Sequence, residues 1–424
     1  MISKISRHRR RSSLSRRRSS KRGRGLSNLN INWRPIILIG GGVLGVAALV
    51  LVVIFVIVPL FGGGPDPTAT ATNSATATPI PTPMAREDMS DGATELTIEE
   101  YKNINDPYVF GNEVIFSTGA KYEDAPEIDR LAIYNLTDGS VTEVSGIEKK
   151  YNSLFEPKMN DKYIVYLDCK SESGGAIVGV DRTTGETFTI REYLYGKPYV
   201  SLSGNYVCWM QQTGRGVDSS GNATYGTDRL YVYDMTTQEA AEIETFANTY
   251  FSYSWAYIGD DGIVYVQPDG EERVISQDHS SSSTDAVITV IPLTEGGDQQ
   301  AIRFKPGTFV YNPLIEGDYI VYLDGTGGPG TNLMMCKKTG NTYSAPVVIA
   351  TDVLNYDVGD GYLVYTLDQQ AVYIYYFGDE STGRLSSTTS RSILASANGK
   401  DVVWYDVTDG LDSPTNVIMH IVVP

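Results

Sequence analysis

The side chains of this sequence that could bind a ligand are aromatic rings and carboxylates beside short apolar runs. Aromatic rings stack on sugars or hold a peptide, and carboxylates accept hydrogen bonds from either ligand. The candidate binding residues are Tyr151, Asp168, Trp255, Tyr311, Asp324 and Tyr356. An alternative interpretation is that these rings only pack the mouth of a channel.

Signals for catalysis are weaker than those for binding. The serine-hydrolase motif G-x-S-x-G does not occur, and His279 and His420 each stand alone in the sequence. The run 325–330 fits a dinucleotide pattern, but Pro329 and the lack of a following helical pattern exclude a phosphate-binding turn. Three His and three Cys argue against a zinc centre or a disulfide framework. We therefore expect no catalytic residue, metal or cofactor.

The candidate residues belong to a repeat that dominates the chain after residue 93. Each copy has a tight turn, two aliphatic residues and a closing aromatic residue, and a second apolar run such as 230–233 follows. The closing residues are Phe116, Tyr166, Trp209, Tyr265, Tyr322, Tyr365 and Trp404. They are separated by 50, 43, 56, 57, 43 and 39 residues. Repeats of this length made of short β-rich runs predict the blades of a β-propeller.

We expect four strands in each blade, named A to D from the channel outward. Strand B carries the paired aliphatic residues, because stacked blades bury it on both faces. The last copy stops at Pro424 after strand C, so its fourth strand must come from elsewhere in the chain. The alternating residues 94–98 are the candidate, and they would close a ring of seven blades without a free edge. A ring of six blades is the alternative.

A known family shares these features. The run Gly-Asp-Tyr-Ile-Val-Tyr-Leu-Asp at 317–324, the strand at 230–234 and the Thr-Gly-Glu turn at 184–186 resemble TolB-like and other WD40-like repeats. The resemblance covers roughly residues 94–424 and implies an all-β propeller domain. It implies no single activity, because such propellers serve transporters, peptidase gates and assembly factors alike.

The two ends of the predicted ring differ in loop length. In an antiparallel blade, the B–C and D–A loops lie at one end, here called the loop face. The A–B and C–D turns lie at the other end, here called the turn face. The insertions, such as 211–228 and 267–285, fall at the loop face together with the candidate binding residues. Because function on such scaffolds usually resides in loops, we expect the ligand at the loop face.

The first 92 residues have a different composition. Residues 36–61 hold no charged side chain and are long enough to cross a bilayer, and the run is too long for a cleavable signal peptide. Twelve basic residues and no acid precede residue 62, so the positive-inside rule places the N-terminus in the cytoplasm. We expect a basic disordered tail at 1–34, a transmembrane signal anchor at 35–61, a Pro/Thr/Ala-rich linker at 62–92 and an extracytoplasmic propeller at 93–424.

The two parts of the chain carry opposite charge. Residues 62–424 hold 22 basic and 51 acidic residues, which argues against a nucleic-acid partner. The basic tail is expected to lie on anionic lipid headgroups; alternatively, it docks a cytoplasmic partner under the control of serine phosphorylation. Three unpaired thiols outside the membrane are compatible with a bacterium that forms few disulfides.

Three functions fit this organisation. The first is a membrane-anchored recognition or scaffold module for a protein, a peptide or a cell-wall glycan. The second is a lyase or glycosidase with paired carboxylates in the propeller channel, and the third is a ligand sensor that signals to the Arg/Ser tail. Acids with raised pKa values on the axis would favour the enzyme, whereas an axis lined by Tyr, Asn and Ser would favour the recognition module.

Overall fold

The computed structural model describes residues 84–85, 88–123, 127–170, 174–194, 196–213, 216–217, 223–224, 227–247, 256–268, 286–293, 301–307, 310–325, 328–368, 370–410 and 416–424. The predicted tail, the predicted transmembrane segment and most of the predicted linker lie outside these residues. Within the described ranges no helix is long and apolar enough to cross a membrane. The one helix in them is the short 3-10 helix η2, Ser90–Gly92.

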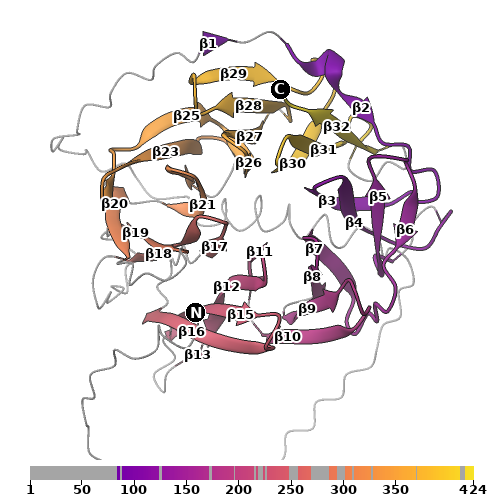
Figure 1. Ribbon diagram of the computed structural model, residues 1–424, viewed down its shortest axis with the longest axis horizontal. Helices are drawn as coiled ribbons and strands as arrows, with labels where there is room; N and C mark the ends of the chain where they lie inside the picture. The colour runs from indigo at the N-terminus through magenta and orange to yellow at the C-terminus, as the bar shows by residue number, and fades with distance from the viewer. Residues whose placement is uncertain are drawn as a thin grey trace, which may run out of the picture. The chain divides into compact units, whose positions relative to one another are not determined.

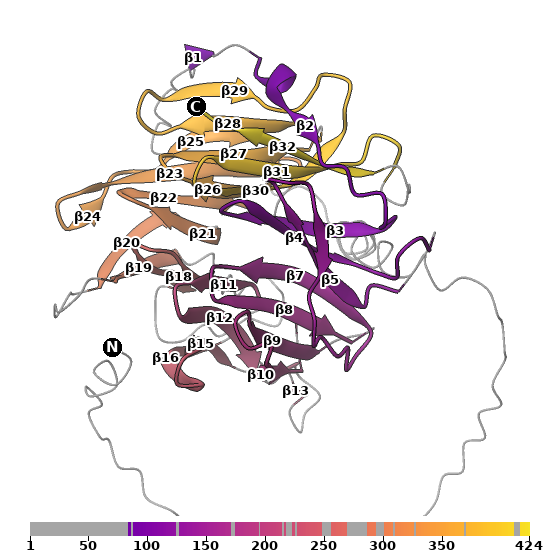
Figure 2. The same cartoon turned by 45° about the vertical axis from the view of Figure 1, so that its right-hand side comes forward.

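Seven sheets are arranged around a central axis, with one strand of each sheet next to that axis (Figures 1 and 2). Blade 1 contains β3 (Ile104–Phe110), β4 (Glu113–Thr118), β5 (Arg130–Asn135) and β6 (Val141–Glu143). Blade 2 contains β7 (Ser153–Met159), β8 (Tyr163–Cys169), β9 (Gly175–Asp181) and β10 (Thr187–Tyr193). Blade 3 contains β11 (Val200–Ser203), β12 (Tyr206–Thr213), β15 (Thr227–Asp234) and β16 (Glu239–Ala247); β13 (Gly216–Val217) and β14 (Ala223–Thr224) form a small hairpin in its B–C loop.

The remaining blades follow the same plan. Blade 4 contains β17 (Ala256–Ile258), β18 (Gly262–Pro268), β19 (Ala286–Pro292) and β20 (Ile302–Gly307). Blade 5 contains β21 (Tyr311–Glu316), β22 (Tyr319–Asp324), β23 (Asn332–Thr339) and β25 (Val347–Thr351), with β24 (Thr342–Tyr343) beside β23. Blade 6 contains β26 (Val353–Gly359), β27 (Tyr362–Leu367), β28 (Val372–Tyr376) and β29 (Ser381–Arg384), and blade 7 contains β30 (Ser392–Asn398), β31 (Asp401–Asp406) and β32 (Val417–Val422). The prediction of an all-β, seven-bladed propeller is confirmed.

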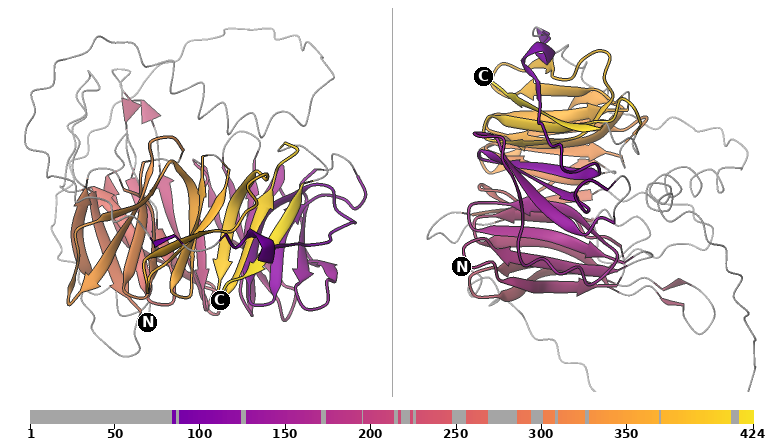
Figure 3. Two further views of the ribbon diagram at one scale, coloured as in Figure 1. Left: turned by 90° about the horizontal axis from the view of Figure 1, so that it is seen from above. Right: turned by 90° about the vertical axis from the view of Figure 1, so that its right-hand side faces the viewer.

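The hydrophobic core is divided among the gaps between neighbouring blades. One cluster joins blades 2 and 3, where Trp209 lies fully buried against Tyr231 with ring centroids 5.2 Å apart. Another joins blades 6 and 7 around Trp404. The closing aromatic residues of the repeat thus fill the space between blades, and the paired aliphatic residues beside them are buried on both faces of strand B. Figure 3 shows the ring edge-on, with the strands running from one face to the other.

The N-terminal strand β2 (Thr94–Glu95) completes blade 7. It pairs with β32 in antiparallel register, Thr94 opposite His420, and the Leu96 amide donates a hydrogen bond to the Ile418 carbonyl at 2.9 Å. The Leu96 side chain is 5% exposed and packs in the core between blades 7 and 1. The predicted closure of the ring by residues 94–98 is confirmed.

A second N-terminal strand extends blade 6. Strand β1 (Met84–Ala85) pairs in parallel with β29, Met84 opposite Ser381, so that this blade has five strands. The amide of Met89 then donates to the carbonyl of Arg384 at 2.9 Å. The sequence predicted these residues as linker, because a strand of two residues leaves no readable alternation.

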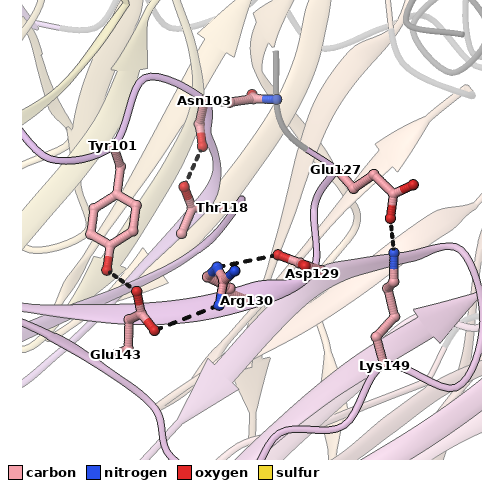
Figure 4. Close-up of polar contacts among 8 residues, drawn as sticks. All are labelled: Tyr101, Asn103, Thr118, Glu127, Asp129, Arg130, Glu143 and Lys149. Atoms are coloured by element: carbon pink, nitrogen blue, oxygen red, sulfur yellow. Dashed lines mark hydrogen bonds and ion pairs between the residues drawn. The ribbon is translucent and has the colours of Figure 1, made fainter. Parts of the chain in front are cut away.

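A polar cluster fastens the segment between β2 and β3 to blade 1 (Figure 4). The Tyr101 hydroxyl donates to Glu143 Oε1 at 2.8 Å, and Arg130 Nη1 lies 3.8 Å from Glu143 Oε2. The hydroxyl of Thr118 donates to the carbonyl of Asn103 at 2.6 Å. Because the Tyr101 ring is itself buried, both polar and apolar contacts hold the segment between β2 and β3 on blade 1.

Candidate functional site

Four inner strands carry a bulge at the same position of the repeat. Register shifts in β3, β7, β21 and β30 each leave one residue with a left-handed backbone. These residues are Asp106, Glu156, Asn312 and Leu394, with φ between +49° and +55°. A proline follows three of them, which a bulge tolerates because proline donates no hydrogen bond to the ladder. Since a bulge redirects the neighbouring side chains, these positions determine which groups face the channel.

A cavity of about 390 Å³ occupies the turn-face end of the channel. Inner strands or A–B turns of all seven blades contribute to its lining. Its walls include Tyr108, Lys158, Tyr199, Tyr257 and Asp357, from blades 1, 2, 3, 4 and 6. Ligand pockets usually measure roughly 300–1,000 Å³, so this cavity is large enough for one side chain or a small group.

Asp357 is the most enclosed acid of this cavity. Its Oδ1 accepts the Val358 amide at 3.0 Å, and its Oδ2 accepts the Ala397 amide of blade 7 at 3.1 Å. Burial raises the pKa of Asp357, while the positive charge of Lys158 and these hydrogen bonds act in the opposite direction. The carboxyl group thus links the inner strands β26 and β30 and also lines the cavity.

An ammonium group is already seated on one of the channel tyrosines. Lys158 Nζ lies 4.4 Å from the centroid of the Tyr108 ring, within the range of a cation–π interaction. Tyr108 has a raised pKa, because it is buried and because the charge of Asp357 opposes its ionisation. The phenol therefore stays neutral and presents its ring face to the cation.

The rim of the cavity is acidic on the side of blades 4, 5 and 6. Burial, assisted by the neighbouring charge of Asp261, raises the pKa of Glu316 from 4.5 to about 7, and Asp360 and Asp260 add to the effect. Asp260 Oδ1 accepts the Ser203 hydroxyl at 2.7 Å, and Asp261 Oδ2 accepts the Gly317 amide at 2.7 Å. Burial and the neighbouring carboxylates thus oppose the ionisation of Glu316 at the rim.

A second charged group lies outside the cavity lining, in the first halves of the inner strands. Asp106 Oδ2 accepts the Glu156 amide at 3.1 Å, and Glu156 forms an ion pair with Lys197. Burial raises the pKa of Asp106, and the negative charge of Glu156 raises it further. Burial lowers the pKa of Lys197, but the charges of Glu156 and Asp106 outweigh burial and raise it overall. This chain of contacts joins blades 1, 2 and 3.

The channel therefore combines the lining expected of an enzyme with the lining expected of a recognition module. Tyrosine rings and carboxylic acids with raised pKa values occur in the same cavity. Asp357 in the cavity, and Asp106 outside its lining, each accept a backbone amide of a neighbouring blade, which gives both a structural role. Among the described residues, no three His, Cys, Asp or Glu side chains are grouped so as to hold a metal ion. The arrangement is suited to binding a polar or cationic group.

Two of the predicted site residues meet at the loop face of blade 2. Both oxygens of Asp168 accept the Tyr151 amide, and Oδ2 also accepts the Lys150 amide at 2.7 Å. Asp168 is 1% exposed and its carboxylate accepts backbone amides of the D–A loop, and its binding role stays a prediction. The half-buried Tyr151 ring has Lys150 Nζ at 5.3 Å and Lys170 Nζ at 4.6 Å from its centroid.

The other predicted residues do not form one cluster. Tyr356 is 6% exposed in the core of blades 5 and 6, and its hydroxyl donates to the carbonyls of Asn312 and Val321, while its binding role stays a prediction. Tyr311 is half-buried and packs against the same core. Asp324 ends β22 opposite Asn332. Trp255 lies outside the described residues, so its binding role stays a prediction.

Sequence reasoning missed the tyrosines and acids of the turn face. Tyr108, Lys158, Tyr257 and Asp357 stand at one position of the repeat, eight residues before the closing aromatic residue. This column contains rings, charged groups and hydroxyls as well as the apolar Leu314, whereas the column one residue later is apolar throughout. That contrast between adjacent columns was the available signal.

No protein-family model and no curated protein matches the sequence. The β-propeller domain of the Trilobed protease from Pyrococcus furiosus, described as having an open velcro topology, is similar in structure. It has a TM-score of 0.51 and 16% identity, with 73% of this chain and 91% of that chain covered. An acylaminoacyl peptidase gives a TM-score of 0.50 at 15% identity and covers 74% of this chain, which spans half of that enzyme. TolB from Acinetobacter baumannii gives a TM-score of 0.37 at 13% identity, with 70% of this chain and 60% of that chain covered. The likeness of this chain to known structures is thus a likeness of fold, that of a β-propeller.

Proposed function

We propose that this protein is a recognition module that binds a protein or peptide at the turn-face cavity of its propeller. The observation that carries the proposal is the cavity itself, walled by Tyr108, Tyr199 and Tyr257 and rimmed by acids. Tyrosines supply large contact areas with few rotatable bonds, which is why they are frequent where proteins bind partners. A glycan ligand is the alternative that the experiment below distinguishes.

We further propose that the propeller is displayed outside the cell on the apolar segment 36–61, with the basic tail in the cytoplasm. This part of the proposal rests on the sequence, in which twelve basic residues precede the apolar run and none of the 51 acids does. On this model the membrane and its anionic lipids are the partners of the N-terminal part. The turn-face cavity serves a ligand of the envelope or of a neighbouring cell.

A photo-crosslinking residue placed at the cavity rim tests the binding site. We would replace Asn205, which lines the cavity, in the full-length protein in its own membrane, and Glu186, an exposed residue of an outer turn, as the control. We expect an adduct from position 205 that is lost in a Tyr257→Leu background and digested by protease, with none from position 186. Adducts only from loop-face positions such as Asp368 would refute the turn face, and an adduct digested only by glycosidases would identify a glycan ligand.

An enzyme is the second candidate, because the half-buried Asp357 shares the cavity with Lys158 and three phenols. A carboxyl group with a raised pKa, a lysine and a phenol hydroxyl are all groups that can act in general acid–base catalysis. Turnover of oligosaccharides by the purified protein that disappears in Lys158→Met would support the enzyme. Ligand binding without turnover would support the recognition module.

A further inference from the structure

We propose that the group received by the turn-face cavity is a cation, the guanidinium or ammonium group of an arginine or lysine side chain on an extended peptide. This inference rests on the proposed function, since it names the chemistry of the ligand bound at the same site. Both side chains offer one positive charge on a long apolar stem, which is the shape that a tyrosine-walled cavity can enclose.

The charge of the lining is the first argument. Five acids and two lysines line the cavity, so the excess is negative. Lys158 already lies on Tyr108, and Lys162 Nζ lies 3.4 Å from Asn205 Oδ1 at the rim. The excess of acids therefore falls on the side of Glu316, Asp260 and Asp360. A cation that enters there meets attraction, and an anion meets repulsion.

The position of Glu316 is the second argument. Glu316 is the last residue of strand β21, and its half-buried carboxyl group lies at the cavity. The charges of Asp260, Asp261 and Asp360 act on it. Among the described residues, no lysine or arginine forms an ion pair with Glu316 within 4.0 Å. Burial and three negative neighbours oppose its ionisation, the hydrogen bond from the Gly361 backbone favours it, and a ligand cation would offset the repulsion. This repulsion lowers the stability of the free protein, and the bound cation reduces it.

The third argument comes from the contact between Lys158 and Tyr108. It shows that an ammonium group fits against a tyrosine ring of this channel at 4.4 Å from the centroid. Tyr257 lies one position before the apolar wall residue Ile258, as Tyr108 lies before Val109, and it lines the same cavity from the side of blade 4. Tyr257 belongs to the blade that also contributes Asp260. We therefore assign Tyr257 as the ring face and Glu316 as the carboxylate that receive the ligand cation.

Binding of tetra-arginine to the full-length protein in phospholipid nanodiscs tests this assignment, with tetraserine and tetraglutamate as comparison peptides. We expect tetra-arginine to bind at pH 8 and Glu316→Gln to weaken it at least tenfold. Glu186→Gln removes the same charge from an exposed outer turn and should change the affinity less than twofold. Equal losses in the two variants would mean diffuse attraction to an acidic protein and would overturn the proposal.

Two further variants separate the ring face from the hydroxyl. Tyr257→Phe keeps the ring and should retain the affinity within twofold, whereas Tyr257→Leu should lose about fivefold. A loss in Tyr257→Phe equal to that in Tyr257→Leu would refute the cation–π contact. If tetraserine binds this cavity as well as tetra-arginine, the cation is wrong and the recognition site stands. If no crosslinked ligand is found at position 205 in the membrane, the recognition site itself is wrong.

Discussion

Glu316 is the residue whose protonation should be visible in the stability of the whole domain. Its folded-state pKa of about 7 lies above the ordinary value of 4.5, so the folded protein binds the proton more strongly than the unfolded chain does. The free energy of unfolding contributed by this group is therefore largest below pH 4.5 and falls as the pH rises from 4.5 to 7. Its half-exposed position reduces the size of the effect but not its sign.

The variant Glu316→Gln isolates this contribution. At pH 8 the native protein carries a carboxylate opposed by three acids, and glutamine removes that charge, so we expect the variant to have a higher melting temperature than the wild type. At pH 4.5 both side chains are uncharged in the folded protein, so the difference should be much smaller. Differential scanning calorimetry at the two pH values measures this. A difference that is the same at both pH values would show that Glu316 does not titrate as described.

Tyr101 offers a test of the polar cluster in Figure 4. Tyr101→Phe removes the hydrogen bond to Glu143 and leaves the buried ring in place, so we expect a loss of about 1–2 kcal/mol in the free energy of unfolding. Tyr122→Phe is the matched control, because Tyr122 is 67% exposed. Urea denaturation measures both. Equal stability of the two variants would mean that the hydroxyl of Tyr101 contributes nothing to holding the segment between β2 and β3.

At the scale of the element, the strand that closes blade 7 can be weakened by a single side chain. Leu96→Ala removes a buried residue of the core between blades 7 and 1, and we expect a loss of about 2–4 kcal/mol. Thr97→Ala, on the neighbouring exposed residue, should change stability by less than about 0.5 kcal/mol. Chemical denaturation of both variants decides the matter. If Leu96→Ala is as stable as Thr97→Ala, packing of the Leu96 side chain between blades 7 and 1 does not stabilise the propeller.

Elements were predictable from the sequence where burial left a repeating pattern, and unpredictable where the register changed. Strand B must be apolar on both faces. The sequence alone therefore predicts strand B of blade 7 from the run Val402, Val403 and Trp404. The register of β26 shifts between Val353 and Asn355. A shift of one residue exchanges the two faces of a strand, so the sequence could not show that Tyr356 enters the core while Asp357 faces the channel. Left-handed bulges depend on neighbouring blades and have no local signature beyond the following proline.

At the scale of the whole molecule, the membrane topology is open to a direct test. Protease added to intact cells should remove the acidic propeller and spare residues 1–34, because the basic tail is proposed to lie in the cytoplasm. Antibodies against the tail and against the propeller follow the two parts. Detergent-permeabilised cells, in which both parts become accessible, are the control. Digestion of the tail with survival of the propeller would reverse the proposed orientation.

Closure of the ring by β2 also has a consequence for how the domain is made. Thr94 and His420 are partners across 326 residues, so β2 is synthesised early and must wait for the last strand. At a synthesis rate of roughly 5–20 residues per second, this delay is on the order of tens of seconds. During that time both edges of the incomplete ring are open, and contacts between such distant residues form slowly. The nascent chain therefore presents open strand edges, which favour edge-to-edge aggregation, until its final strand emerges.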